Sequence, residues 1–190
     1  MKKVYTGGGD RGKTSLFSGE RVSKSGAQMR ALGNLDELNS IIGALIANLP
    51  TGEHGLSAEL CGVQSDLFHL GSWMATSPDS PPIEKLTQIT SDKITHVEQA
   101  IDRISKQLPK LSGFILPGGH ISSAWAHLAR TVCRRCERDV VEFYEKSFKG
   151  PEARRFRNVL VYLNRLSDYL FVLARHCNLI HGVPEKLWKR

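Results

Sequence analysis

The stretch that decides the fold is "WAHLARTVCRRCERDVVEFY", residues 125–144. Its apolar residues recur at steps of three and four, which places them on one side of an α-helix. The same alternation occurs in four other segments, at residues 35–49, 56–74, 94–108 and 159–177. Pro50 and Pro109 follow two of these segments, and Ser91 is the expected N-cap of the third. The pattern predicts an all-α fold, a five-helix bundle.

Length and composition predict a single domain over residues 1–190, with a glycine-rich N-terminal arm (1–30) before the bundle (31–190). Hydrophobic residues make up 41% of the chain and charged residues 24%, which is typical of a globular protein. There is neither a signal peptide nor a long apolar span, so we expect no membrane association. The four cysteines lie within apolar helical patterns, which favours reduced, packed thiols and a cytoplasmic protein: Cys61, Cys133, Cys136 and Cys177.

The polar side of residues 125–144 carries Arg130, Arg134, Glu137 and Arg138. A solvated helix face is one explanation. Three arginines at i, i+4 and i+8 repel one another, however, unless an anion meets them, and the guanidinium fork suits phosphate and carboxylate. A second polar stripe is predicted beside the core of the last helix, at Asn164, Asp168, Phe171 and Arg175.

The sequence "TGGGDRGKTS", residues 6–15, matches the P-loop expression from Gly7 to Thr14. A P-loop fold is not expected, because no buried strand precedes the glycines and no helical pattern follows them. The chemistry still favours a polyphosphate. Glycine N–H groups can converge on one anion, Lys13 adds positive charge, and Asp10 could hold a lysine or a magnesium ion. A flexible arm without a ligand is the alternative.

Five segments in order resemble the PduO-type ATP:cob(I)alamin adenosyltransferases: "TGGGDRGKTSL", "GNLDELNS", "FILPGG", "ARTVCRRCERDVV" and "YLNRLSDYLFVLAR". The resemblance implies a homotrimer of five-helix bundles with active sites between subunits. It implies transfer of the 5′-deoxyadenosyl group of ATP to the cobalt of cob(I)alamin, giving adenosylcobalamin and triphosphate. It implies that the protein binds ATP, Mg2+ and cobalamin, the last as a substrate. It also implies a reductase and a B12-dependent acceptor enzyme as partners.

The resemblance also implies roles for individual residues. The ATP site would comprise residues of the arm and of the last two helices: Thr6, Gly7, Gly8, Gly9, Thr14, Lys24, Arg134, Glu137, Arg138 and Asn164. We add Lys13 from the chemistry of the loop. The arm of the family usually reads Thr-Arg-Thr-Gly-Asp, so contacts at Gly7 and Gly8 would come from the backbone alone.

The residues expected to act in the reaction itself are Asp36, Arg130, Arg134 and Phe114. By resemblance, Asp36 and Arg130 bridge neighbouring subunits at the active site, and Arg134 contacts the triphosphate. Phe114 would be an apolar wedge beneath the corrin that excludes the lower axial ligand of the cobalt. A core phenylalanine is the alternative for Phe114.

A non-catalytic, basic helical protein that binds nucleotide or nucleic acid is the main alternative function, since the net charge is +7. The chain contains no recognised nucleic-acid-binding motif, so we expect no nucleic-acid partner. A ferritin-like metal bundle would need Glu-x-x-His pairs, which are absent, and we expect no metal held by protein side chains alone.

Overall fold

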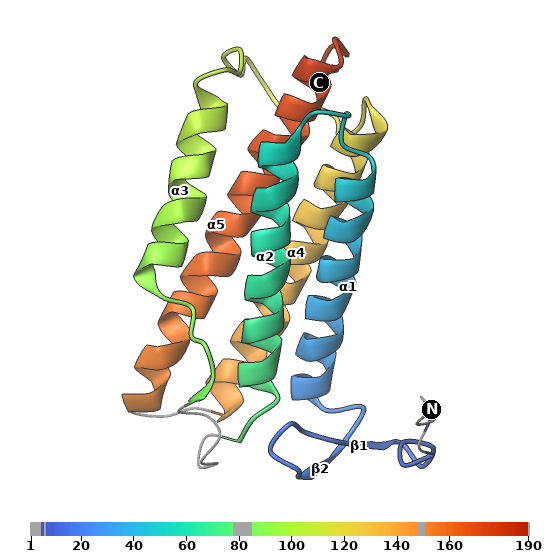
Figure 1. Cartoon of the computed structure of the whole chain (residues 1–190), viewed down its shortest axis with the longest axis vertical. Helices are drawn as coiled ribbons and strands as arrows, with labels where there is room; N and C mark the ends of the chain where they lie inside the picture. Colours follow the sequence, from blue (N-terminus) through green and yellow to red (C-terminus); the bar gives the residue numbers. More distant parts are fainter. Residues whose placement is uncertain (1–4, 6, 78–84, 148–150, 190) are drawn as a thin grey trace.

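The computed structural model describes residues 5, 7–77, 85–147 and 151–189, without the side chains at 147 and 151–155. Five helices run alternately up and down: α1 (Ala27–Ala47), α2 (His54–Met74), α3 (Ser91–Ser105), α4 (Ile121–Ser147) and α5 (Pro151–Ile180) (Figure 1). The predicted five-helix bundle is confirmed. A two-stranded antiparallel sheet, β1 (Lys13–Ser15) with β2 (Arg21–Ser23), precedes it and was not predicted.

One core runs the length of the bundle and draws residues from all five helices. Helix α4 packs against both α1 and α5. Its buried sector is therefore centred on Ala129, Cys133 and Cys136, which are fully buried. Leu128, one of the apolar residues of the 125–144 pattern expected on the buried side, is 44% exposed, because it lies to one side of this sector.

Two helix starts differ from the prediction. The N-cap of α3 is Thr90, whose side chain makes no capping hydrogen bond, and Ser91 is the first helical residue, so the prediction of Ser91 as N-cap is wrong. Helix α1 begins at Ala27, within the segment predicted as arm. Arg30 and Asn34 in its first turns bond Asp139 on α4, which gives this extension a packing partner.

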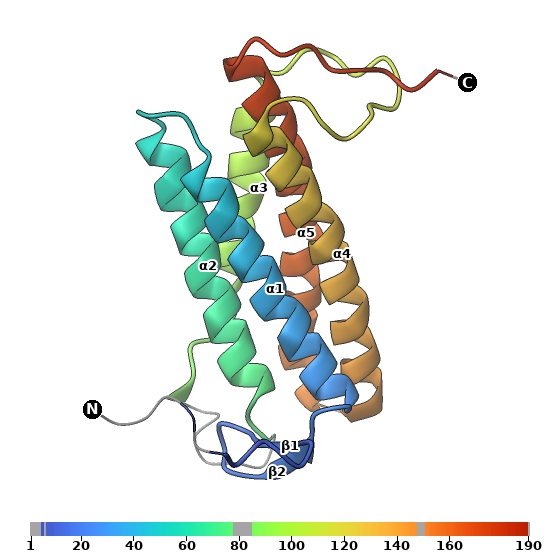
Figure 2. The same cartoon turned by 90° about the vertical axis from the view of Figure 1, so that its right-hand side faces the viewer.

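The hairpin and the loop before α4 lie at opposite ends of the bundle (Figure 2). The hairpin is tied to the end of α2, where the Phe17 amide donates to the carbonyl of Ala75 at 2.8 Å and the Ser77 amide donates to Ser18 at 3.1 Å. At the other end, the loop runs beside the C-terminal segment through an antiparallel bridge between Ile115 and Leu187. In the part of the chain that the structure describes, we find no helix with the length and apolarity needed to span a bilayer.

Candidate active site

The glycine loop of the arm consists of two successive turns. The Asp10 amide donates to the carbonyl of Gly7 at 3.3 Å, and the Gly12 amide donates to the carbonyl of Gly9 at 3.2 Å. Gly7 and Gly12 have φ angles of 68° and 73°, a conformation that other residues rarely adopt. The loop leads into strand β1 and not into a helix, which confirms that this is no P-loop fold. Thr6 lies outside the described residues.

Two basic side chains from β2 and the residue after it fold over this loop. Arg21 donates to the carbonyl of Gly8 at 2.5 Å, and the Lys24 amide donates to the carbonyl of Gly12 at 2.9 Å. The Lys24 ammonium lies where a Cβ atom on Gly9 would be only 2.9 Å from it, so a side chain at position 9 would displace the lysine. Lys13 is exposed and Thr14 half-buried on β1. The arm therefore gathers Arg21, Lys24 and Lys13 around the glycine loop, and positive charge of this kind suits a polyphosphate.

The polar sides of α4 and α5 meet midway along the bundle. Asn164 donates to the carboxylate of Glu137 at 3.2 Å and accepts from Arg165 at 2.9 Å, so two predicted ATP contacts lie side by side. Arg134 and Arg138 are exposed, and neither has an acidic partner among the described residues. The stripe thus presents two guanidinium groups without an acidic partner beside a polar pair, and that of Arg138 donates to the carbonyl of Arg134 at 3.1 Å.

Not every charged residue predicted for these stripes is available to a ligand. Arg175 is buried, donates to Glu185 at 2.7 Å and caps the carbonyl of Pro109 at 2.8 Å, so its prediction as part of a ligand-facing stripe is wrong. The cause is Glu185, which lies in the irregular C-terminal segment and neutralises the guanidinium. Arg175 instead fastens that segment and the loop before α4 to α5.

Phe114 lies at the mouth of a cavity of about 510 Å3 that Arg130, His127 and Phe171 also line. Its side chain is 77% exposed, which excludes a core phenylalanine. Sequence reasoning missed the C-terminal segment here. The Trp188 amide donates to the carbonyl of Phe114 at 2.7 Å, and the two rings meet edge to face with centroids 6.4 Å apart. The only sequence signal was an apolar Leu187–Trp188 pair in a basic tail.

The Phe114 loop is held in place by the turn that ends it. Gly119 has a φ angle of 108°, and a Cβ atom there would overlap the side-chain amide of Asn178 on α5. Asn178 is buried, accepts from the His120 amide at 2.9 Å and donates to the carbonyl of Gly118 at 3.0 Å. The glycine pair lets the chain pass directly over this amide, which fixes where the loop joins the start of α4.

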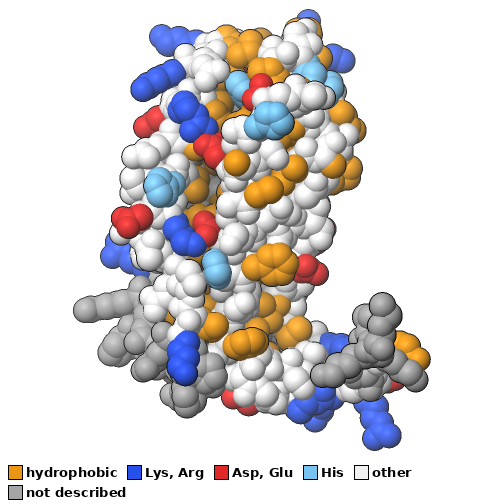
Figure 3. Space-filling model, in the orientation of Figure 1, with side chains coloured by type: hydrophobic (Ala, Val, Ile, Leu, Met, Phe, Trp, Pro, Cys, Tyr) orange, Lys and Arg blue, Asp and Glu red, His pale blue; other side chains and the backbone are white. Residues whose placement is uncertain are grey.

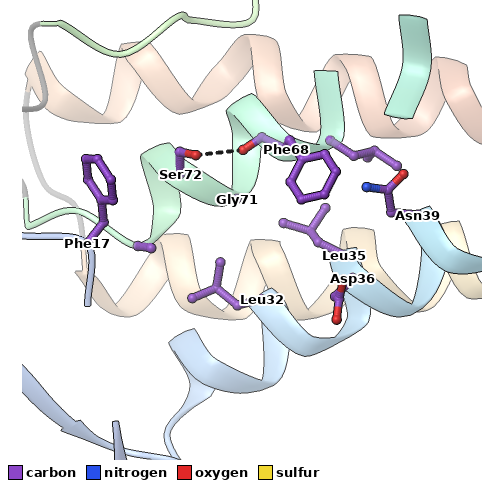
Figure 4. Close-up of a pocket in the computed structure, with 10 residues that line it drawn as sticks. Phe17, Leu32, Leu35, Asp36, Asn39, Phe68, Gly71 and Ser72 are labelled. Atoms are coloured by element: carbon purple, nitrogen blue, oxygen red, sulfur yellow. Dashed lines mark hydrogen bonds between the residues drawn. The ribbon is translucent and has the colours of Figure 1, made fainter. Parts of the chain in front are cut away.

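Asp36 lies elsewhere, in a cavity of about 270 Å3 between α1 and α2. Figure 4 shows Phe17 and Phe68 on either side of this hollow and Asp36 at its α1 wall. Both phenylalanines are exposed, and the buried Oδ1 atom of Asn39 has no hydrogen-bond partner among the described residues. Asp36 and Arg130 therefore line different cavities, and within the described residues of one chain they form no ion pair.

The Phe114 cavity contains one buried imidazole, His127, and one half-buried guanidinium, Arg130. The Nε atom of Arg130 is buried without a partner among the described residues, and burial, followed by the charge of Arg134, lowers the pKa of Arg130. Burial, followed by the charge of Arg130, lowers the pKa of His127 to about 4. At neutral pH the cavity thus contains a neutral imidazole beside a guanidinium that lacks an anion.

The cysteines of α4 belong to the core and not to this chemistry. Burial raises the pKa of the Cys133 thiol, which donates to the carbonyl of Leu163 at 3.3 Å, and burial raises the pKa of Cys136 to about 12. Protonated, packed thiols are poor nucleophiles and poor ligands. The prediction of packed thiols is confirmed for Cys133, Cys136 and Cys177, which are buried, and is wrong for Cys61, which is exposed on α2. The described residues contain no group of three His, Cys, Asp or Glu side chains placed to hold a metal ion.

A cavity of about 630 Å3 between α2, α3 and α5 contains none of the predicted site residues. Two ion pairs join α3 to α2 across it, Lys93 with Asp66 and Arg103 with Glu59. Tyr162 and Tyr169 of α5 donate to the same two carboxylates. Figure 3 shows basic and acidic side chains alternating along the side where α3 faces α2. Because each charge is already matched, we assign these residues to bracing α3.

Comparisons with known proteins identify the family. The family model for cobalamin adenosyltransferase matches residues 4–177. The corrinoid adenosyltransferase MMAB of Bos taurus is 42% identical over 100% of this chain and 77% of its own length. The corrinoid adenosyltransferase of Bacillus subtilis is 38% identical, over 99% of this chain and 93% of its own.

Among solved structures, a phenylalanine-to-alanine variant of the PduO-type ATP:corrinoid adenosyltransferase from Lactobacillus reuteri, complexed with cobalamin and ATP, superposes with a TM-score of 0.89. It is 31% identical, and the match covers 99% of this chain and 100% of that one. On the strength of a family match across most of the sequence and of relatives that align over its whole length, the chain belongs to the cobalamin adenosyltransferase family.

Proposed function

We propose that this protein transfers the 5′-deoxyadenosyl group of ATP to the cobalt of cob(I)alamin, giving adenosylcobalamin and triphosphate. Family membership supports the reaction, and the relative from Lactobacillus reuteri is complexed with both substrates. The observation in this chain that carries the proposal is Phe114, an exposed aromatic ring at the mouth of a cavity that also holds an unpaired arginine. A helix bundle that only binds nucleotide has no need of such a ring.

The chemistry requires orientation and charge neutralisation from the protein. Cobalt(I) is itself the nucleophile: it attacks C5′ of ATP, the cobalt–carbon bond forms, and the C5′–oxygen bond breaks as triphosphate leaves. Arg134 and Arg138 are unpaired cations suited to the departing triphosphate, and the glycine loop with Lys13, Thr14 and Lys24 supplies further donors. In this proposal Mg2+ arrives with the nucleotide, and Asp10 and Glu137 are the acids of the two nucleotide-binding segments that could reach it.

A second copy of the chain is needed to complete the site. The arm and the Phe114 loop lie at opposite ends of the bundle (Figure 2), and Asp36 and Arg130 line separate cavities. We therefore propose a homotrimer in which Asp36 of one copy pairs with Arg130 of the next. The buried Nε atom of Arg130 supports this pairing, because such a donor needs an acceptor and the described residues supply none.

Phe114 would act by occupying space. Cob(II)alamin is harder to reduce while an axial ligand donates to the cobalt, and an apolar ring beneath the corrin keeps that ligand away. In this proposal a reductase supplies the electron that reduces cob(II)alamin, and a B12-dependent enzyme takes up the adenosylcobalamin. The four cysteines are free, which fits a reducing compartment such as the cytoplasm.

One assay tests the proposal: ATP with chemically reduced cobalamin, followed by the absorbance change as the cobalt–carbon bond forms. We expect that change together with release of triphosphate. Release of phosphate or ADP, or no cobalt–carbon bond, would contradict the proposed reaction.

A variant tests the role of Phe114. Phe114→Ala should lose most turnover when the reaction starts from cob(II)alamin and much less when cob(I)alamin is supplied. Leu116→Ala is the matched control, because Leu116 is an exposed apolar residue of the same loop. Spectroscopy with ATP bound measures how much cob(II)alamin is four-coordinate, that is, without its lower axial ligand. If this amount is undiminished in Phe114→Ala, the wedge is another residue.

A further inference from the structure

His127 is a buried polar residue of the Phe114 cavity that the proposed reaction does not use. It lies on α4 one turn before Arg130, and only 4% of it is exposed. Neither ring nitrogen has a hydrogen-bond partner among the described residues. A buried donor or acceptor without a partner is costly to the fold, so the imidazole is placed for a group that enters the cavity.

The protonation state of His127 narrows the choice of that group. Arg130 on the same helix disfavours the imidazolium ion, and burial does so more strongly, whereas Glu185 of the C-terminal segment favours it. The balance leaves the ring neutral, with one N–H donor and one acceptor nitrogen. Phosphates and carboxylates offer acceptors only, whereas a carboxamide offers both a donor and an acceptor.

The surroundings fix the orientation of the ring. Phe171 of α5 meets it edge to face, with centroids 6.3 Å apart and planes at 62°. The other walls are mostly apolar side chains of the loop before α4: Leu111, Phe114, Ile115 and Pro117. In such walls, one neutral hydrogen-bonding side chain determines orientation and selectivity more than overall affinity.

We propose that His127 recognises a side-chain carboxamide on the rim of the corrin ring and so selects amidated corrinoids. The inference rests on the proposed function, because a corrinoid carries carboxamide side chains around its ring and enters this cavity in the reaction. The other role open to an imidazole here is axial coordination of cobalt. Coordination would give the metal the additional ligand that Phe114 is proposed to exclude, so the two side chains would oppose each other.

The test uses His127→Leu, His127→Gln and, as a matched control, Leu128→Ala on the exposed side of the same turn. KM is measured for cob(I)alamin and for ATP, together with KM for cobalamin derivatives in which a single side-chain carboxamide has been hydrolysed to a carboxylate. His127→Leu should raise KM for cobalamin about tenfold, the effect of one lost hydrogen bond, with KM for ATP nearly unchanged. His127→Gln should recover most of the loss, since it keeps a donor and an acceptor.

The derivatives separate recognition from general damage to the cavity. If His127 contacts one carboxamide, the wild type should have a higher KM for the derivative that lacks that carboxamide than for cobalamin. His127→Leu should abolish this difference in KM and leave the differences for the other derivatives as they are in the wild type. Equal losses for every corrinoid, or an equal loss for ATP, would overturn the inference. So would an imidazole nitrogen coupling in the electron paramagnetic resonance spectrum of bound cob(II)alamin that disappears in His127→Leu. A wild type that forms no cobalt–carbon bond would instead overturn the proposed function itself.

Discussion

Adjacent arginines on α4 have different environments. Arg135 bonds Glu37 and Asn34 on α1, whereas Arg134 is exposed and has no acidic partner among the described residues. Helical spacing alone predicted that Arg134 points away from the core. It could not show that Arg135 is paired, because Glu37 lies on another helix. The free arginine is therefore the candidate for the triphosphate, and the paired one is structural.

Alanine at each position tests this difference. Arg134→Ala should lower kcat by about 100-fold to 1000-fold, as the loss of one donor to a developing negative charge does in other enzymes, while the free energy of unfolding stays unchanged. Arg135→Ala should keep its activity and lose at most about 1 kcal/mol of stability, because its ion pair is half exposed. Steady-state kinetics and urea denaturation measure both. Near-normal turnover in Arg134→Ala would remove it from the site.

His127 also predicts how stability depends on pH. Its pKa of about 4 in the folded protein lies below the unfolded value of 6.5. Above pH 6.5 the His127 imidazole is neutral in both the folded and the unfolded state, and the full unfolding free energy is present. As the pH falls toward about 4, the unfolded state takes up the proton first, so up to about 3 kcal/mol of unfolding free energy is lost.

Urea denaturation of the wild type and of His127→Leu over this pH range isolates the effect. The wild type should lose more stability than the variant between about pH 6.5 and about pH 4. Burial also lowers the pKa values of His120 and His176, so the variant should retain part of the slope. Identical slopes in the two proteins would mean that His127 is accessible to protons in the folded state.

At the scale of elements, the helices could be predicted from sequence and the segments that position the site could not. A period of three and four residues over several turns identifies a helix wherever one side is buried, as it is in all five. The hairpin could not be predicted in this way, because its strands are only three residues long and show no periodic pattern. The bridge between Ile115 and Leu187 could not be predicted either, because it pairs residues that are far apart in the sequence. These irregular segments carry the glycine loop and Phe114.

The turn at Gly119 gives a direct test of how the Phe114 loop is positioned. Gly119→Ala puts a Cβ atom into the amide of Asn178 at a φ angle of 108°, so the loop must shift, at a cost of at least about 1–3 kcal/mol. Corrinoid binding should weaken, while ATP binding at the distant arm should persist. Gly113→Ala is the control for stability, since a Cβ atom there meets nothing within 4 Å and its φ angle is ordinary, although Gly113 also lines the cavity. If Gly119→Ala binds corrinoid normally, the turn does not position the loop.

At the scale of the whole molecule, a single chain holds the candidate site in separate pieces. The charge stripe of α4 reaches the cavity beside Phe114 through Arg130, whereas the hollow around Asp36 lies between α1 and α2 and is lined by none of these residues. The motifs could be found in the sequence, yet their failure to converge within one chain could be seen only in three dimensions. A helical pattern shows which residues share a side of one helix, and it does not show which faces of two copies meet.

Subunit mixing tests whether two copies share one site. Suppose that Asp36→Ala and Arg134→Ala each abolish activity, and that the two variant chains are refolded together in equal amounts. If a site takes Asp36 from one copy and Arg134 from the next, about a quarter of the interfaces in a closed ring combine two intact residues. If both residues act within one chain, every site in this mixture lacks one of them, and activity stays near zero.

The matched control is a chain that carries both substitutions, refolded with an equal amount of wild type. A shared site again leaves about a quarter of the interfaces intact, because each contributing side must come from a wild-type chain. A site within one chain leaves about half intact. Equal recovery in the two mixtures therefore supports the intersubunit site, whereas no recovery in the first and about half in the second would assign Asp36 and Arg134 to a single chain. Sedimentation of the mixtures confirms that the assemblies have re-formed before activity is compared.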